Sequence, residues 1–418
     1  MDSPVVTYAE PTTPIPEPPE NLVQRWIVKL RWPIFALVAF ILIAAHNGYW
    51  RLGRDSALYR SVADNLASGR GYTFRGQREH HIYPGLPYLL AGIDKTFGRQ
   101  DPMQPRAALL IMLVMSLLTL VVVYHLVRTY FPPWIAVAVT TGVGINHEFL
   151  QQTHELMTDL PFLLGVCTTL LGIARLPQAK TDGRRAIFIS LILVGAIVTV
   201  TMRPTFWALL LAWIGACFIG LIHARRRTMY LAGIAVASAL LLTWVAVDPR
   251  TPFRNLTGGR YEQKVVTTLK HLSDVKWSKN LERLSTRHLP EFLFGLEMPM
   301  PWGPLVCMIV LVAGVLLIRK SPLWGLYIMV TAAMVIVLGG AARYYLMVLP
   351  LLLVGWATFA KWISDVSARW YRIPYAGELV MLFWLGLATG PHLVRDSGFI
   401  LEQRGYAKDH SYKGFLEV

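Results

Sequence analysis

Long apolar segments, separated by short polar ones, dominate the pattern of this 418-residue chain. Most approach the roughly 20 residues that an α-helix needs to cross a bilayer. The segments lie at 33–50, 106–127, 133–147, 158–175, 186–202, 204–222, 229–247, 303–318, 322–340, 344–361 and 376–393. The pattern therefore predicts an all-α polytopic membrane protein with about eleven transmembrane helices.

Two further helices are predicted in the polar loop that follows the first apolar segment, residues 51–105. After Asp55, apolar residues recur at a helical spacing as far as Leu66, which indicates a helix lying in the membrane interface. We expect it to end near Gly69, since glycine favours the left-handed position past a C-cap. A second amphipathic helix is expected from Pro87 to about Phe97.

Composition supports the membrane class, because 54% of the residues are hydrophobic, only 16% are charged and the mean hydropathy is +0.45. Soluble domains carry about 25% charged residues. The three cysteines fall in apolar segments, so they predict no disulfide framework. The net charge of +15 agrees with cytoplasmic basic loops and anionic lipid headgroups. We expect no nucleic-acid partner.

Basic residues in the short loops set the expected orientation, which places the N-terminus in the cytoplasm. We expect a disordered cytoplasmic tail over 1–24, a transmembrane catalytic domain over 25–393 and an outer tail over 394–418. Both long loops, 51–105 and 248–302, then lie outside. Both loops are basic, although the positive-inside rule disfavours basic residues in outer loops. Binding of an anionic lipid-linked ligand is one reason why an outer surface would carry them.

Carboxylates at two helix mouths on this outer side are the candidate catalytic groups, because charge near a bilayer is costly and needs a reason. Asp55 follows the first apolar segment, while Glu155 and Asp159 precede a later one. Residues four apart share a helical face, so Glu155 and Asp159 are expected to point the same way. The structural alternative is that Asp55 is an N-cap and that the other pair caps the span containing Pro161.

Two arginines, Arg203 and Arg343, lie at outer helix ends, where guanidinium groups would suit phosphate recognition. Their alternative role is snorkelling or pairing with the acids. His80, His81 and His154 are conceivable metal ligands, although their spacing matches no metal motif. A divalent metal is therefore allowed by the sequence without being required by it.

These residues resemble motifs of the GT-C superfamily of membrane glycosyltransferases. The resemblance rests on Asp55, on the segment from His81 to Pro87, on Glu155 to Pro161, and on the Arg-Tyr run that begins at Arg343 and ends at Pro350. It is nearest to the branch with protein O-mannosyltransferases, lipid A aminoarabinose transferases and lipopolysaccharide-core transferases. The chain departs from that pattern in the His81–Pro87 segment, where relatives often carry a lysine or histidine before two prolines.

The resemblance implies a glycosyltransferase that moves a sugar from a polyprenyl-phosphate donor to a lipid, glycan or protein acceptor, with inversion. Asp55 would be the base, and Asp159 and Glu155 would line the same cavity. The substrate-binding residues would be Arg203, Arg343, Tyr83, Tyr344 and His81. A multi-pass bacterial inner-membrane location is expected. The alternatives are a transporter and a lipid scramblase without glycosyl transfer.

Overall fold

The computed structural model describes residues 22–46, 50–51, 55–78, 82–99, 105–223, 277–338, 342–371 and 375–406. Every predicted apolar segment within these residues forms a helix, which confirms the all-α class. These helices are α2 (Arg31–Ala45), α5 (Arg106–Val127), α6 (Pro133–Gly144), α8 (Asp159–Arg175), α9 (Asp182–Met202), α10 (Phe206–His223), α16 (Trp302–Lys320), α17 (Pro322–Leu338), α18 (Leu349–Tyr371) and α19 (Ala376–Tyr406). The predicted segment 229–247 and most of the expected N-terminal tail lie outside the described residues.

Shorter elements connect and cover these helices. They are α1 (Leu22–Lys29), α3 (Ser56–Ala67), α4 (Gly85–Phe97), α7 (His147–Gln152), η1 (Leu176–Gln178), α14 (Trp277–Arg283), the π-helix η3 (Leu284–His288), α15 (Leu289–Phe294) and the 3₁₀ helix η4 (Ala342–Val348). The last helix, α19, continues to Tyr406, past the position at which we expected the outer tail to begin.

Five helices of the described chain are long and apolar enough to cross a membrane, or six if α1 and α2, bent by 50°, form one span. The protein is therefore a multi-pass membrane protein, but the expected count of about eleven is not confirmed. Several predicted segments form apolar helices that are short for a bilayer. These shorter apolar helices are Pro133–Gly144, Phe206–Gly220 and Pro322–Val337.

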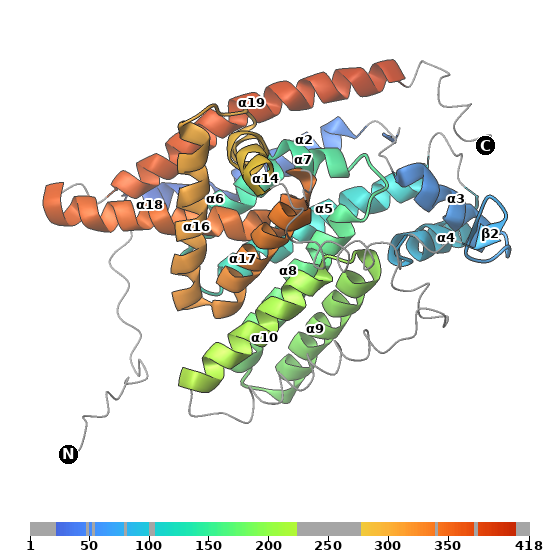
Figure 1. Cartoon of the computed structure of the whole chain (residues 1–418), viewed down its shortest axis with the longest axis horizontal. Coiled ribbons are helices and arrows are strands. Elements are labelled where there is room, and N and C mark those ends of the chain that lie inside the picture. The colour runs from blue at the N-terminus through green and yellow to red at the C-terminus, as the bar shows by residue number, and fades with distance from the viewer. Residues whose placement is uncertain are drawn as a thin grey trace.

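Close packing of α8 against α9 depends on glycines. A Cβ added at Gly165 would lie 2.8 Å from Thr199 Oγ1, and one at Gly195 would lie 2.5 Å from Thr169 Oγ1. Small residues let membrane helices approach closely and gain dispersion contacts. This close packing therefore holds the C-terminal end of α9, where Arg203 follows, at a set distance from the start of α8, where Asp159 lies. Figure 1 shows α8 and α9 running side by side.

The first loop confirms both predicted helices, α3 and α4, which lie together beside the hairpin in Figure 1. A buried ion pair joins them, with Arg60 Nη1 3.0 Å from Asp94 Oδ2, and Asp64 lies 3.1 Å from the other guanidinium nitrogen. Gly69 follows the C-cap of α3 at a φ of 76°, as predicted. Within the described part of this loop, α3 and α4 are therefore packed against each other as one unit.

A short antiparallel hairpin, β1 (Thr73–Phe74) and β2 (Gln77–Arg78), separates the two helices and was not predicted. Arg75 and Gly76 form its turn at φ values of 51° and 74°. Two positive φ values in a two-residue loop give a twist that matches paired strands. Only glycine adopts this conformation without cost, so the hairpin had a weak sequence signal.

Candidate functional site

Asp55 occupies the N-cap position of α3, but its side chain makes no capping hydrogen bond. Its carboxylate instead lies 3.8 Å from the guanidinium of Arg343 on η4. The side chains are 38% and 22% exposed, so both groups remain open to a substrate. The Asp55 side chain therefore does not cap α3, and its carboxylate faces the guanidinium of Arg343.

Asp159, the first residue of α8, forms a buried ion pair with Arg203, the residue that ends α9. The two side chains are 1% and 9% exposed. Burial of two charges is tolerated only when each neutralises the other. The pair therefore joins α8 to α9 at the same end of the bundle that carries Asp55.

The ring of Tyr344 connects the two ion pairs. The guanidinium carbon of Arg203 lies 5.0 Å from the ring centroid, and that of Arg343 lies 5.7 Å from it. Both distances suit cation–π contact. Asp55, Arg343, Tyr344, Arg203 and Asp159 thus form one continuous group, which we call the arginine–aspartate cluster. It brings together five of the residues that the sequence singled out.

Glu155 lies beside the arginine–aspartate cluster but not where we expected it. It precedes α8, in a bridge to Arg51, so Glu155 and Asp159 do not share a helical face and that prediction was wrong. Its carboxylate accepts hydrogen bonds from Gln151 at 2.6 Å and Gln152 at 3.2 Å, and Arg51 lies 4.0 Å away. Burial raises the pKa of Glu155 above its usual range, and the Gln151 hydrogen bond opposes that shift.

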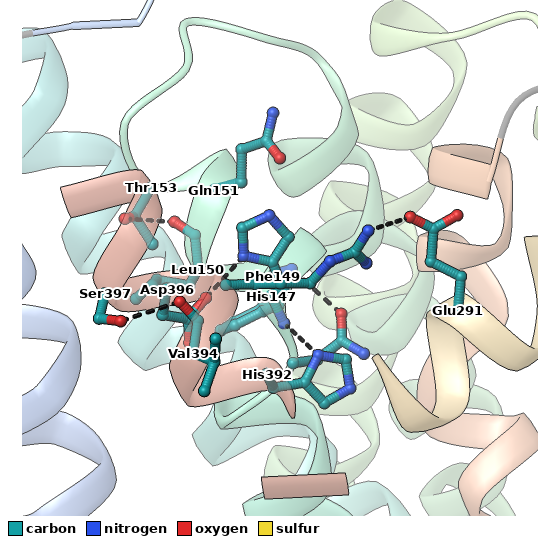
Figure 2. A network of polar contacts seen from close by, with 12 residues as sticks. His147, Phe149, Leu150, Gln151, Thr153, Glu291, His392, Val394, Asp396 and Ser397 are labelled. Carbon is teal, nitrogen blue, oxygen red and sulfur yellow. Dashed lines mark hydrogen bonds and ion pairs between the residues drawn. The ribbon is translucent and has the colours of Figure 1, made fainter. Parts of the chain in front are cut away.

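Helix α7 adds a carboxylate that the sequence reading overlooked. Burial raises the pKa of Glu148, and the charges of Glu291 and Asp159 act in the same direction. Figure 2 shows how α7 is fixed to α19: His147 Nδ1 lies 2.7 Å from Asp396 Oδ1, and the His147 backbone N–H donates to His392 Nδ1 at 3.2 Å. Helix α7 thus holds one carboxylate, that of Glu148, near Asp159.

His154 is buried and does not belong to a metal site among the described residues. Its ring centroid lies 5.8 Å from that of His46. Burial, together with the charge of His46, lowers the pKa of His154 to about 3. At neutral pH the ring is therefore uncharged and packs as part of the core under the site.

The remaining predicted residues are less exposed or fall outside the described residues. Tyr83 is 2% exposed just before α4, so this structure does not present it to a substrate. His80 and His81 lie outside the described residues. Tyr59 on α3 was missed by the sequence reading, yet it interacts electrostatically with Arg203. Only the fold could reveal it, because a tyrosine on an amphipathic helix resembles any core residue.

A metal site was tested against the residues present. Among the described ranges, no three histidine, cysteine, aspartate or glutamate side chains converge as metal ligands. Asp55 and Asp159 each face an arginine instead. The arginine–aspartate cluster therefore does not fit a metal ion.

The sequence matches no protein-family model, and no curated protein matches it significantly. Solved structures do match. An oligosaccharyltransferase from Archaeoglobus fulgidus, in complex with Zn and sulfate, gives a TM-score of 0.55 at 16% identity, over 87% of this chain and 53% of that one. The chain thus spans about half the length of that enzyme.

ArnT from Cupriavidus metallidurans bound to undecaprenyl phosphate gives a TM-score of 0.53 at 13% identity, over 92% of this chain and 77% of that one. The apo state of the same protein gives 0.53 at 14% identity, over 93% and 78%. At such identities the similarity establishes the fold, and the residues must supply the argument for activity.

Proposed function

We propose that this chain, which has the fold of the GT-C superfamily of membrane glycosyltransferases, is itself a glycosyltransferase. It transfers a sugar from a polyprenyl-phosphate donor to an acceptor at the outer face of the membrane. The observation that carries the proposal is the arginine–aspartate cluster. It sets an open carboxylate, Asp55, 3.8 Å from an open guanidinium, that of Arg343. Glycosyl transfer from a lipid phosphate needs both groups at one point.

Arg343 is the proposed ligand of the donor phosphate. Its side chain is 22% exposed, and its contact with Asp55 is longer than a hydrogen bond. A phosphate that approaches the cluster can therefore replace Asp55 as the partner of Arg343. Arg203 is 9% exposed and tightly paired, so its role is to hold Asp159 and one face of Tyr344 in place.

Asp55 is the proposed base. The acceptor hydroxyl transfers its proton to the Asp55 carboxylate while its oxygen forms a bond to the anomeric carbon. The bond from that carbon to the phosphate oxygen breaks on the opposite face, and the polyprenyl phosphate leaves with the electron pair, so the anomeric centre is inverted. Arg343 stabilises the charge that develops on the leaving phosphate. Donor binding thereby frees the base from its cation.

Glu155 and Glu148 are proposed to complete the acidic wall near Asp159. The donor class agrees with a structural neighbour that binds undecaprenyl phosphate, and the acceptor is a lipid, glycan or protein hydroxyl. We propose the bacterial inner membrane as the location. The transporter alternative is less well supported, because the arginine–aspartate cluster joins helix ends, whereas transporters hold ionisable groups near the bilayer midplane.

The test uses membranes that contain the full chain and radiolabelled polyprenyl-phosphate sugars. Wild type should transfer the label. Asp55→Asn should fold and bind the lipid, but its transfer should fall about 10²-fold or more, since an amide cannot accept the proton. No caps are lost in this variant, because the Asp55 side chain makes no capping bond. Transfer within a few-fold of wild type would remove Asp55 from the catalytic role.

A further inference from the structure

A small hollow, open to solvent and with enclosed room for about one water-sized group, lies beside η4, between α14, η3 and the C-terminal part of α17. Figure 1 shows α14 and α17 near one another. Its polar lining consists of Asn280, Arg283, His288 and Tyr345.

The backbone of η4 separates this hollow from the arginine–aspartate cluster. A 3₁₀ helix has about three residues per turn, so consecutive side chains leave it roughly 120° apart. Arg343 and Tyr344 point into the arginine–aspartate cluster, whereas Tyr345 lines the hollow. A group bound in the hollow would therefore contact η4 at Tyr345, two residues after Arg343, the proposed ligand of the donor phosphate.

The hydroxyl of Tyr345 is the feature that points to a ligand. The residue is 2% exposed, and its hydroxyl has no hydrogen-bond partner among the described residues. A buried hydroxyl without a partner costs roughly 1–3 kcal/mol, so such groups are rare. The ring is held against Phe292, with 6.4 Å between their centroids. The position of the hydroxyl is thus set by packing, as in a site prepared for a ligand.

The other polar groups determine which ligand would fit. Asn280 donates to the Ile336 carbonyl at 2.8 Å and so fixes α14 against α17. Burial lowers the pKa of His288, and the charges of Arg287 and Arg283 lower it further, so the ring is neutral and offers one N–H. Arg283 supplies a guanidinium at the exposed mouth. No carboxylate is among the lining residues, so donors predominate.

The backbone is irregular at this hollow as well. Leu284–His288 forms a π-helix between α14 and α15. Short π-helical turns are rare in proteins, and many of those that do occur lie at functional sites. This irregularity brings Leu284 and His288 of η3 to the hollow along with Arg283 at the end of α14. We propose that the hollow receives one oxygen of an anionic group of the acceptor, a phosphate or a carboxylate, whose other atoms lie at the open mouth beside Arg283; the inference rests on the proposed function.

The test uses the full chain in phosphatidylcholine nanodiscs whose donor site is first saturated with polyprenyl phosphate. Glycerol phosphate and glucuronate are then titrated separately by calorimetry. Wild type should bind at least one of them saturably, and the preferred probe identifies a phosphate or a carboxylate ligand. Tyr345→Phe and Arg283→Gln should each weaken that binding by about tenfold or more, since each loses a hydrogen bond to a charged group.

Arg287→Gln is the matched control. Arg287 belongs to the same π-helix and lies 3.0 Å from Glu297, but it does not line the hollow, so the variant should bind like wild type. Binding of neither probe, or equal binding by wild type and both hollow variants, would overturn the proposal. If polyprenyl phosphate itself fails to bind, the donor assignment is wrong. The probe titrations of wild type and the two hollow variants would still show whether the hollow binds an anion.

Discussion

Arg343 of η4 lies 3.8 Å from the carboxylate of Asp55 at the start of α3. This contact joins two segments that are far apart in the sequence and leaves both side chains partly open to solvent. It differs from the Asp159–Arg203 pair, which is buried and closed. The two ion pairs of the arginine–aspartate cluster should therefore respond differently to substitution.

Arg343→Ala should weaken polyprenyl-phosphate binding by about 10- to 100-fold, the range expected for loss of a charge-assisted hydrogen bond. Its melting temperature should change little, because a partly exposed pair contributes at most about 1 kcal/mol. The affinity of Arg343→Lys for the lipid should fall between those of wild type and Arg343→Ala, since lysine keeps the charge but not the planar guanidinium. Calorimetry with the lipid measures the affinity, and wild-type affinity in Arg343→Ala would make this arginine only a membrane anchor.

Arg203→Ala should instead destabilise the protein by about 3–5 kcal/mol, because it leaves the Asp159 carboxylate buried without its cation. The double variant Arg203→Met with Asp159→Leu should recover much of that stability without recovering transfer. Thermal unfolding in detergent, together with the transfer assay, separates the two effects. A single variant that melts like wild type would show that the pair is not buried as described.

Gly85→Ala should disturb the docking of the first loop. A Cβ at this position would lie 2.8 Å from the Thr201 carbonyl oxygen, so α4 must move away from the end of α9, next to Arg203. Gly92→Ala on the same helix is the control, since nothing lies within 4 Å of its added Cβ. It should stabilise α4 by about 0.5–1 kcal/mol. Melting temperatures should therefore move in opposite directions, and equal shifts would contradict the close approach.

His154 should make stability depend on pH. Its pKa falls from an ordinary 6.5 to about 3 in the folded protein. A lowered folded-state pKa contributes stability that is complete above pH 6.5 and is lost as the pH falls toward 3. Each unit corresponds to about 1.4 kcal/mol. In His154→Asn the melting temperature should therefore depend less on pH over this window than in wild type. An equal pH dependence in the two proteins would exclude burial of a neutral His154 ring.

The orientation of both long loops can be tested by cysteine labelling. Ser68 and Ser278 are exposed at the ends of α3 and α14, and we expect Ser68→Cys and Ser278→Cys to react with an impermeant reagent in intact cells. Thr181→Cys, in the exposed connection before α9, should react only after permeabilisation, because the basic loops are expected inside. Reaction of Thr181→Cys before permeabilisation would reverse the topology.

Much of the fold follows from the sequence by itself. Apolar runs predicted the long helices, a 3.6-residue period predicted α3 and α4, and Gly69 marked the end of α3. These features depend on local burial and backbone conformation, which neighbouring residues encode. The same pattern also indicated that the acids and arginines lie at helix ends on one side.

Only the tertiary structure decided which of these groups meet. Asp55 could serve as an N-cap or as a partner of a cation, and the fold pairs it with Arg343 because η4 packs near the start of α3. Glu155 was expected on a helix with Asp159, but it lies in the connection before α8, where it forms a bridge with Arg51. Tyr345 looked like any core aromatic until its hydroxyl proved to have no partner in the described part of the chain. Contacts between distant segments depend on packing geometry, which local periodicity does not encode.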